Sequence, residues 1–172
     1  EELPKAMEDY LFTNLLDSMC NSFMAQTSDE ICSRKGVKRE DADAFAVMSH
    51  SRTAASIDSG LFDEEIVSVE TPDGIVGSKD EDHVVRGTSK ESLAGLRAAF
   101  GPDSLVTAGN ASGVVDGAAA LIIKSAEKAE EDGDNPLARI VSWGIVGLEP
   151  AIMAYGPVPS SRKALEKAGL SV

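Results

Sequence analysis

The chain has 172 residues, of which 42% are hydrophobic and 26% are charged, and this suits a folded domain with a real core. Its formal net charge of −13 at pH 7 argues against a general nucleic-acid surface, although a local cluster of basic residues can still bind an anionic ligand. No apolar run approaches the roughly 18 residues of a bilayer-spanning helix, and the acidic first residues do not resemble a signal peptide.

Up to about residue 104, the predicted helices and short strands follow one another irregularly. The expected elements are helices at 4–18, 27–36 and 39–59, a hairpin at 65–76, a polar loop at 78–86 and a helix at 88–100. Apolar residues every three or four positions indicate the helices. Two of the helices also have capping boxes, Thr27 with Glu30 and Thr88 with Glu91. Alternation at 65–70, the turn residues Pro72-Asp73-Gly74 and the apolar pair Ile75-Val76 after them indicate the hairpin.

After about residue 104, strands and helices alternate, which is typical of a layered α/β unit. The expected elements are strands at 105–107, 118–124 and 138–148 and helices at 125–133 and 159–168. The acidic stretch at 130–135 is the best candidate for a linker between two such units. Because the chain starts without Met, we expect it to begin within a longer protein.

The two cysteines and two histidines form no pattern of metal ligands. Cys20 and Cys32 lack the C-x-x-C spacing and a nearby histidine cluster, so we expect no metal site. We expect buried thiols, with a disulfide as the alternative. His50 falls in the predicted long helix and His83 in the acidic loop, and both are expected to be surface or structural residues.

The stretch at 107–113, T-A-G-N-A-S-G, consists of small residues between two apolar segments. Glycine lets the backbone adopt positive φ and approach a ligand closely. One interpretation is therefore a loop that wraps around a narrow molecule. The other is a tight turn that packs against a neighbouring sheet, since glycine-rich loops are common and weak signals.

Residues 107–120 resemble the thiolase segment T-A-G-N-A-S-G-x-N-D-G-A-A-A. Residues 96–100 are similar to the thiolase L-[RK]-P-A-F, with Ala98 in the place of proline. Further similar segments lie at 43–46, 63–67, 139–143, 156–159, 162–165 and 167–169. The resemblance implies an α/β, thiolase-like fold that is incomplete. It implies an α+β loop domain at 1–114, the end of the N-terminal thiolase half at 115–133 and the start of the C-terminal half at 134–172.

A thiolase takes its two reactive cysteines, its histidine and its oxyanion-hole donors from four motifs: C-x-S, N-E-A-F, G-H-P and C-x-G. The last three do not occur in this chain. Cys20-Asn21-Ser22 has the letters of the first motif, but it falls in the part that resembles the loop domain, and we interpret Cys20 as structural. We therefore expect no catalytic residue in these 172 residues.

The resemblance does imply residues that bind coenzyme A and the substrate. They are Met24, Arg86, Ser92, Phe100, Ala108, Ser112 and Gly113. By this resemblance the Ser112 hydroxyl hydrogen-bonds the pantetheine arm, and Ala108 and Gly113 line the same tunnel. Pantetheine suits such a wall because it is narrow, carries little charge and has two amides that need partners.

The other four residues align with family residues that contact other parts of the ligand or line the tunnel. Arg86 corresponds to an arginine that packs on adenine, and Ser92 to a serine near the nucleotide. Phe100 corresponds to the tunnel wall. The alternatives are a solvated surface charge for Arg86 and a helix-end core residue for Phe100. Met24 corresponds to a methionine near the acyl group, where its neighbours in the family pattern are replaced by Phe23 and Ala25.

Two functions remain open at this point. In the first, the chain is a segment of an acyltransferase of fatty acid metabolism that cleaves 3-oxoacyl-CoA with coenzyme A or condenses acetyl-CoA with an acyl-CoA. In the second, it is a non-catalytic thiolase-like module that binds coenzyme A esters or a protein partner. The resemblance implies no cofactor, since coenzyme A is a substrate, and a homodimer or homotetramer of an intact enzyme. We expect a soluble intracellular protein of the cytoplasm, mitochondrion or peroxisome, without nucleic acid or membrane span.

Overall fold

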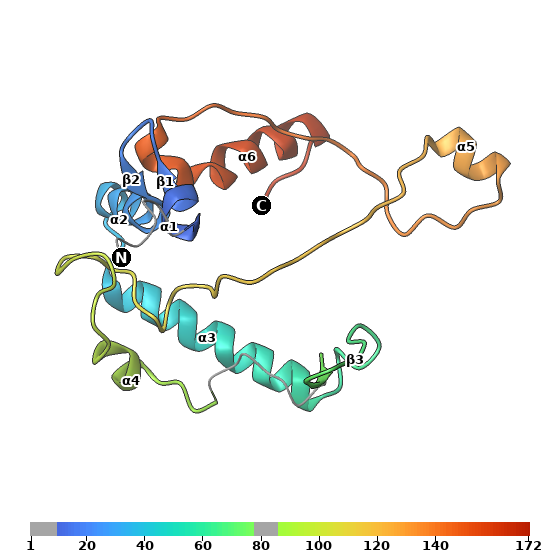
Figure 1. The fold of residues 1–172 in the computed structure, drawn as a ribbon. Helices are drawn as coiled ribbons and strands as arrows, with labels where there is room; N and C mark the ends of the chain where they lie inside the picture. Colours follow the sequence, from blue (N-terminus) through green and yellow to red (C-terminus); the bar gives the residue numbers. More distant parts are fainter. Residues whose placement is uncertain (1–9, 78–85) are drawn as a thin grey trace, which may run out of the picture. The chain divides into compact units, whose positions relative to one another are not determined.

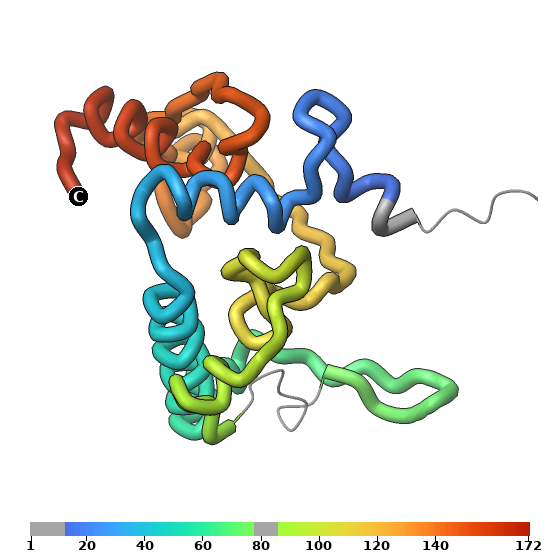
Figure 2. The backbone as a smooth tube through the Cα atoms, turned by 90° about the vertical axis from the view of Figure 1, so that its left-hand side faces the viewer, coloured from blue at the N-terminus to red at the C-terminus, as the bar shows by residue number. Residues whose placement is uncertain are grey.

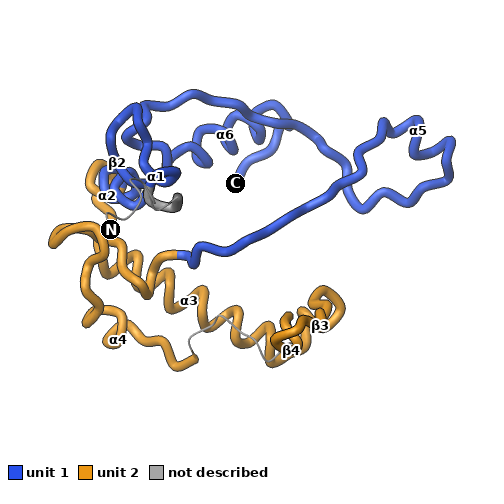
Figure 3. The backbone as a smooth tube through the Cα atoms, in the orientation of Figure 1, with its two compact units in different colours: residues 1–31, 112–172 blue, residues 32–111 orange. Residues whose placement is uncertain are grey.

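The computed structural model describes residues 10–77 and 86–172, and the chain divides into two compact units (Figure 3). Unit 1 comprises residues 1–31 and 112–172, and unit 2 comprises residues 32–111. The elements of Figure 1 are, in chain order, α1 (Tyr10–Leu15), β1 (Leu16–Asp17), β2 (Ser22–Phe23), α2 (Met24–Lys35), α3 (Arg39–Asp58), β3 (Val69–Thr71), β4 (Gly74–Val76), α4 (Lys90–Ala94), α5 (Ala126–Glu131), the 3₁₀ helix η1 (Pro150–Tyr155) and α6 (Pro157–Ala168). His83, most of the loop predicted at 78–86 and the start of the helix predicted at 4–18 lie outside the described residues.

The long helix of unit 2, α3, begins and ends at residues that suit those positions. The backbone N–H of Lys38, just before the helix, donates to Asp41 Oδ2 at 3.0 Å. Glu40 and Asp41 place negative charge in the first turn, where the helix dipole favours it. Gly60, with a φ of 74°, takes the left-handed conformation that commonly follows a last helical turn. The helix predicted at 39–59 is confirmed.

Beyond the C-terminal end of α3, β3 and β4 form an antiparallel hairpin (Figure 2). Val69 pairs with Val76, and Thr71 pairs with Gly74 across the turn. Gly74 has a φ of 133°, which side chains strongly disfavour, so the turn depends on glycine at this position. The predicted hairpin is confirmed, but its first strand is shorter than the sequence indicated.

Helix α4 begins with a different cap from the predicted one. Ser89 Oγ accepts a hydrogen bond from the backbone N–H of Ser92 at 3.2 Å, and Ser92 Oγ accepts one from the backbone N–H of Ser89 at 3.0 Å. The capping box predicted for Thr88 with Glu91 is therefore wrong. Both pairs have the required spacing of three, and a serine at the third helical position serves here in place of the acidic residue that we expected.

The chain after α4 folds back on itself instead of continuing as a helix to residue 100. The backbone N–H of Ala99 donates to the Val106 carbonyl at 2.9 Å, and Ala98 forms an isolated antiparallel bridge with Thr107. The strand predicted at 105–107 is thus reduced to a single bridge. Thr107 is fully buried, so this bridge anchors the segment in the interior of unit 2.

In unit 1, α2 begins three residues earlier than predicted. The backbone N–H of Phe23 donates to Gln26 Oε1 at 2.8 Å, and the helix starts at Met24. Thr27 is therefore not an N-cap. It is 1% exposed within the helix, and its hydroxyl donates to the Met24 carbonyl at 2.7 Å. The preceding helical turn thus supplies the partner that the buried Thr27 hydroxyl needs.

The second half of unit 1 contains an extended segment that lies along α6. Ser142 Oγ donates to the Ala164 carbonyl at 2.6 Å, and Lys167 Nζ donates to the Trp143 carbonyl at 3.0 Å. A Cβ atom at Gly144 would lie 2.1 Å from the carbonyl oxygen of Ser160, so this close approach requires glycine. The predicted helix at 159–168 is confirmed as α6 and begins two residues earlier.

The extended segments of unit 1 do not form the predicted strands. Within residues 10–77 and 86–172, neither 118–124 nor 138–148 pairs with another strand. Their apolar side chains are exposed, with Leu121 at 87% and Ile122 at 92%. A strand forms only where a neighbouring segment offers hydrogen-bonding partners for its backbone. An apolar run or an alternating pattern shows that a segment is suited to a sheet, but it does not supply that neighbour.

Candidate substrate-binding site

The T-A-G-N turn is built around the side chain and carbonyl of Thr107. The backbone N–H groups of Asn110 and Ala111 donate to the Thr107 carbonyl at 3.3 and 3.1 Å. Thr107 Oγ1 accepts from the backbone N–H of Gly109 at 3.2 Å. Ala108 is exposed on this turn, whereas Thr107 is buried. The small-residue stretch is therefore a tight turn that presents one outer side to solvent.

The side chain of Asn110 uses all of its hydrogen-bonding groups to hold this turn. Its Oδ1 accepts from the backbone N–H of Thr107 at 2.8 Å. Its Nδ2 donates to the Leu105 carbonyl at 2.8 Å and to Asp43 Oδ1 at 3.0 Å. Asparagine is common in turns because its side chain can bond to nearby backbone. Here it also connects the turn to α3, where Asp43 lies.

Asp43 is buried, at 3% exposure, and is paired on its other oxygen with Arg39. Arg39 Nε donates to Asp43 Oδ2 at 2.8 Å. Arg39 Nη2 donates to the carbonyls of Leu93 and Leu96 at 2.7 and 3.3 Å, at and just beyond the C-terminal end of α4. A positive charge suits this end of a helix. We call Arg39, Asp43 and Asn110 the polar cluster of unit 2.

The turn also packs against α4 at Gly109. A Cβ atom at this position would lie 2.4 Å from Leu93 Cδ2 and 2.6 Å from Leu96 Cδ1. Leu93 is itself buried, at 5% exposure. The turn is therefore held by polar contacts to α3 and by close apolar packing on α4, which leaves little freedom for Ala108.

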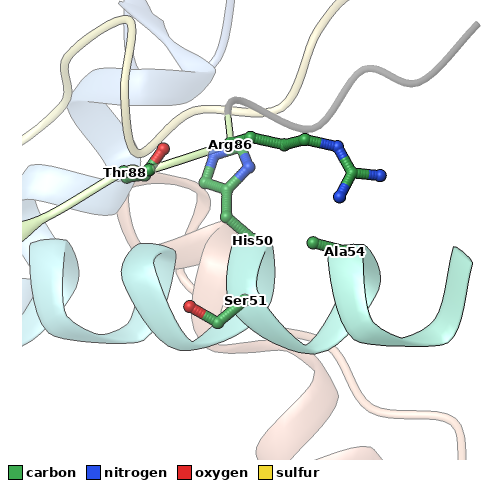
Figure 4. A pocket seen from close by; sticks show the side chains of 6 residues that line it. His50, Ser51, Ala54, Arg86 and Thr88 are labelled. Atoms are coloured by element: carbon green, nitrogen blue, oxygen red, sulfur yellow. The ribbon is translucent and has the colours of Figure 1, made fainter. Parts of the chain in front are cut away.

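A shallow pocket of about 250 Å³ lies elsewhere in unit 2 (Figure 4). Its lining residues, from α3 and from the segment before α4, are His50, Ser51, Ala54, Arg86, Gly87 and Thr88. In Figure 4 the His50 ring rises from α3 towards Arg86 and Thr88. Arg86 Nη1 donates to both carboxylate oxygens of Asp58, at 3.0 and 3.2 Å, and both side chains are substantially exposed. The pocket thus has two basic groups on its wall.

The structure places the seven predicted binding residues in both units. Arg86, Ser92, Phe100 and Ala108 belong to unit 2, and Met24, Ser112 and Gly113 belong to unit 1. Ala108, Ser112 and Gly113 are exposed, and Met24 is half-buried at the start of α2. Phe100 is 38% exposed. The Ser92 hydroxyl is already used in the cap of α4, where it also donates to the Ser89 carbonyl at 2.9 Å.

Two features of unit 2 were not predicted from the sequence. One is His50 as a pocket-lining residue, since a histidine within a predicted helix gives no sign of what it faces. The other is the polar cluster, whose contact between Asn110 and Asp43 joins residues 67 positions apart. The only local signal for the cluster was the i, i+4 spacing of Arg39 and Asp43 on the predicted helix.

Other sites have few signs in the described part of the chain. Cys20 and Cys32 are both half-buried and form no disulfide with each other. Residues 10–77 and 86–172 contain no group of three or more His, Cys, Asp or Glu side chains arranged to hold a metal ion. In the same residues, no helix is long and apolar enough to cross a membrane.

Two family models match the chain over nearly its whole length. The model described as "Thiolase, N-terminal domain" matches residues 3–127, and the one described as "Thiolase, C-terminal domain" matches residues 134–172. Among curated proteins, an acetyl-CoA acetyltransferase of Allochromatium vinosum is 44% identical over 168 residues, which cover 95% of this chain and 43% of that protein. The chain thus spans less than half the length of this relative.

Solved structures give the same result for the fold. Human mitochondrial 3-ketoacyl-CoA thiolase matches with a TM-score of 0.86 and 39% identity, over 96% of this chain and 42% of that one. The acetyl-CoA acetyltransferase of Bacillus anthracis also matches with a TM-score of 0.86, with 40% identity over 100% of this chain and 44% of that one. These matches confirm the incomplete α/β fold that was predicted from the sequence.

Proposed function

The chain belongs to the thiolase family, and from this premise we propose that it is the central segment of a coenzyme A-dependent acyltransferase. The intact enzyme would cleave 3-oxoacyl-CoA with coenzyme A or condense acetyl-CoA with an acyl-CoA. Within it, residues 1–114 would form the loop domain, 115–133 the end of the N-terminal half and 134–172 the start of the C-terminal half. We propose a homodimer or homotetramer, which light scattering of the full-length protein tests.

The observation that carries this proposal is the T-A-G-N-A-S-G turn. Its tight backbone leaves Ala108 exposed, and the next residues along the chain, Ser112 and Gly113, are exposed as well. These residues add almost no bulk, and Ser112 adds one hydroxyl. A pantetheine arm needs such a surface, because it is narrow and has amide groups that must keep hydrogen bonds when they leave water.

The pocket beside α3 supports a place for the nucleotide end of the ligand. An exposed ion pair such as Arg86 with Asp58 contributes little stability, so the guanidinium can exchange this partner for a phosphate or pack on a flat ring. Phe100 and Met24 would contact the less polar parts of the substrate. The Ser92 hydroxyl is engaged in the cap of α4. We therefore assign Ser92 a position near the nucleotide in which its role is to hold the start of α4.

The experiment measures thiolytic cleavage of acetoacetyl-CoA by the full-length protein that carries this chain. We expect Ser112→Ala to raise the KM for acetoacetyl-CoA several-fold, since a neutral hydrogen bond is worth about 1 kcal/mol, and to leave the melting temperature unchanged. Ser112→Phe should abolish use of the substrate in a folded enzyme. The matched control is Ser161→Phe, at an exposed position of α6, which should keep wild-type kinetics.

Three results would argue against the proposal. Coenzyme A binding without any cleavage by the full-length wild type would favour the non-catalytic module. Absence of both binding and cleavage would remove the proposed function altogether. Unchanged kinetics in a stably folded Ser112→Phe enzyme would remove Ser112 from the substrate wall.

A further inference from the structure

The polar cluster of unit 2 contains a buried carboxylate whose two oxygens serve different segments. Asp43 Oδ2 accepts from Arg39 on the same helix, and Asp43 Oδ1 accepts from Asn110 on the turn. A carboxylate with 3% exposure is costly to leave without donors, because it has lost its hydration. Arg39, on the same helix, supplies the donor for Oδ2. Oδ1 needs a donor from elsewhere in the chain, and this need determines where Asn110 must lie.

The side chain of Asn110 is suited to this position by its chemistry and length. It needs two donors, for Asp43 and for the Leu105 carbonyl, and one acceptor, for the backbone N–H of Thr107. Of the short side chains, only the asparagine amide provides two N–H groups and a carbonyl oxygen. Aspartate at 110 would keep the acceptor but direct a second negative charge at Asp43.

We propose that Asn110, anchored on Asp43, is a positioning residue for coenzyme A ester binding. The proposal rests on the proposed function, because it assumes that the turn contacts the ligand. Asn110 acts from the inner side of the turn, where its amide bonds to Leu105, Thr107 and Asp43. Ala108 is on the exposed part, and Ser112 follows two residues later. Asn110 thus fixes the backbone of Ala108, the predicted contact residue within this turn of unit 2, without touching the ligand itself.

Small displacements of such a backbone matter because binding groups work only within narrow distances. A shift of about 1 Å in a positioning element can reduce catalytic efficiency by about a hundredfold. Asn110→Asp should therefore weaken coenzyme A binding and raise the KM more than it lowers kcat. A role restricted to stability predicts instead a lower melting temperature with unchanged binding by the folded fraction.

The test uses the full-length protein, with coenzyme A binding measured by titration calorimetry and with KM and kcat measured for acetoacetyl-CoA. We expect Asn110→Asp to raise the Kd and KM by about tenfold to a hundredfold, the range that a displacement of up to about 1 Å in a positioning element can cause. The double variant Asp43→Asn with Asn110→Asp restores a donor–acceptor pair between the two positions and should recover part of this loss, since the Leu105 carbonyl still lacks its donor. The control is Ala55→Gly on an exposed part of α3, which lowers helix stability without touching the turn.

The outcomes separate this inference from the proposed function. A wild-type protein that neither binds coenzyme A nor cleaves acetoacetyl-CoA overturns both. If the wild type is active and Asn110→Asp keeps its Kd and KM while its melting temperature falls like that of Ala55→Gly, the inference alone is wrong. Should Asn110→Asp not fold, Asn110→Ser decides by the same criteria, since it removes the amide without adding a charge.

Discussion

At the scale of single residues, Gly109 and Gly95 differ in the space around them. A Cβ atom at Gly109 would lie within 2.6 Å of two leucine side chains of the α4 region, whereas a Cβ atom at Gly95 would meet only the Ser92 carbonyl oxygen, at 3.8 Å. Neither glycine has a positive φ that forbids a side chain. Comparing an alanine substitution at each of these positions therefore isolates the effect of an added methyl group on packing.

We expect Gly109→Ala in the full-length protein to lower the free energy of unfolding by roughly 1–3 kcal/mol, because Leu93 and Leu96 must move to admit the methyl group. Gly95→Ala, at a φ of −76° that alanine adopts, should leave it unchanged or raise it by a few tenths of a kcal/mol through reduced freedom of the unfolded chain. Denaturant unfolding followed by circular dichroism measures both. Equal stability of the two variants would show that the turn does not pack on Leu93 as described.

At the scale of elements, α5 and its flanking residues form a small unit closed by charges. Ser125 caps α5 by accepting from the backbone N–H of Lys128 at 3.1 Å. Lys124 Nζ donates to Asp132 at 2.9 Å and also to Asp134, and Lys128 Nζ donates to Asp132 at 2.6 Å. All of these groups are accessible to solvent, so their contribution to stability is modest and sensitive to salt.

The charges of the α5 loop predict a dependence on pH. Lys128, and after it Lys124, hold the pKa of Asp132 below its usual value, so the stabilisation is present at neutral pH and is lost as pH falls through that lowered pKa, below about 4. Asp134 and then Asp132 raise the pKa of Lys124, so that contribution is lost only as pH rises past the ordinary lysine pKa, about 10.4.

We expect a carboxylate titration by NMR to place the pKa of Asp132 below the ordinary aspartate value. Lys128→Gln should raise this pKa most, Lys124→Gln should raise it less, and both effects should shrink at high salt. Lys90→Gln, on α4, serves as the control and should leave Asp132 unchanged. A pKa of Asp132 that does not respond to Lys128→Gln would disprove the ion pair.

Local signals predicted some elements well and others poorly. Helix α3 was predicted within one residue at its end because its cap charges and Gly60 act locally. The strands expected at 118–124 and 138–148 were not found, because pairing depends on neighbours that a pattern does not specify. Sequence reasoning proposed the T-A-G-N-A-S-G stretch as a candidate site but not what holds it, since the cluster depends on contacts 54 and 67 positions apart.

At the scale of the whole molecule, unit 1 has long apolar segments without cover. Val115, Ile122 and Ile145 are exposed by 74%, 92% and 75%. Exposed apolar segments of this kind usually mark an interaction site or a tendency to aggregate. The chain also spans less than half of the relatives it matches. We therefore expect these segments to be covered by protein in the intact protein.

The 172-residue chain expressed by itself should not cleave acetoacetyl-CoA, because it lacks the N-E-A-F, G-H-P and C-x-G motifs of the family. It should bind an apolar dye such as ANS more strongly than the full-length protein and self-associate, most of all near its isoelectric point of about 4.5. Thiolytic activity of the purified chain, verified by mass, would contradict the first expectation. Dye binding no stronger than that of the full-length protein would contradict the second.

The long separation between Asp43 and Asn110 also has a consequence for biosynthesis. Ribosomes add roughly 5–20 residues per second, so Asp43 leaves the exit tunnel several seconds before Asn110. During that interval Arg39, four residues earlier on the same helix, can already pair with the carboxylate. Helix α3 can therefore form early with its charge pair in place, whereas unit 2 must wait for the turn before Asp43 can be enclosed. A nascent chain halted before residue 110 should thus be a better substrate for proteases and chaperones than one halted beyond it.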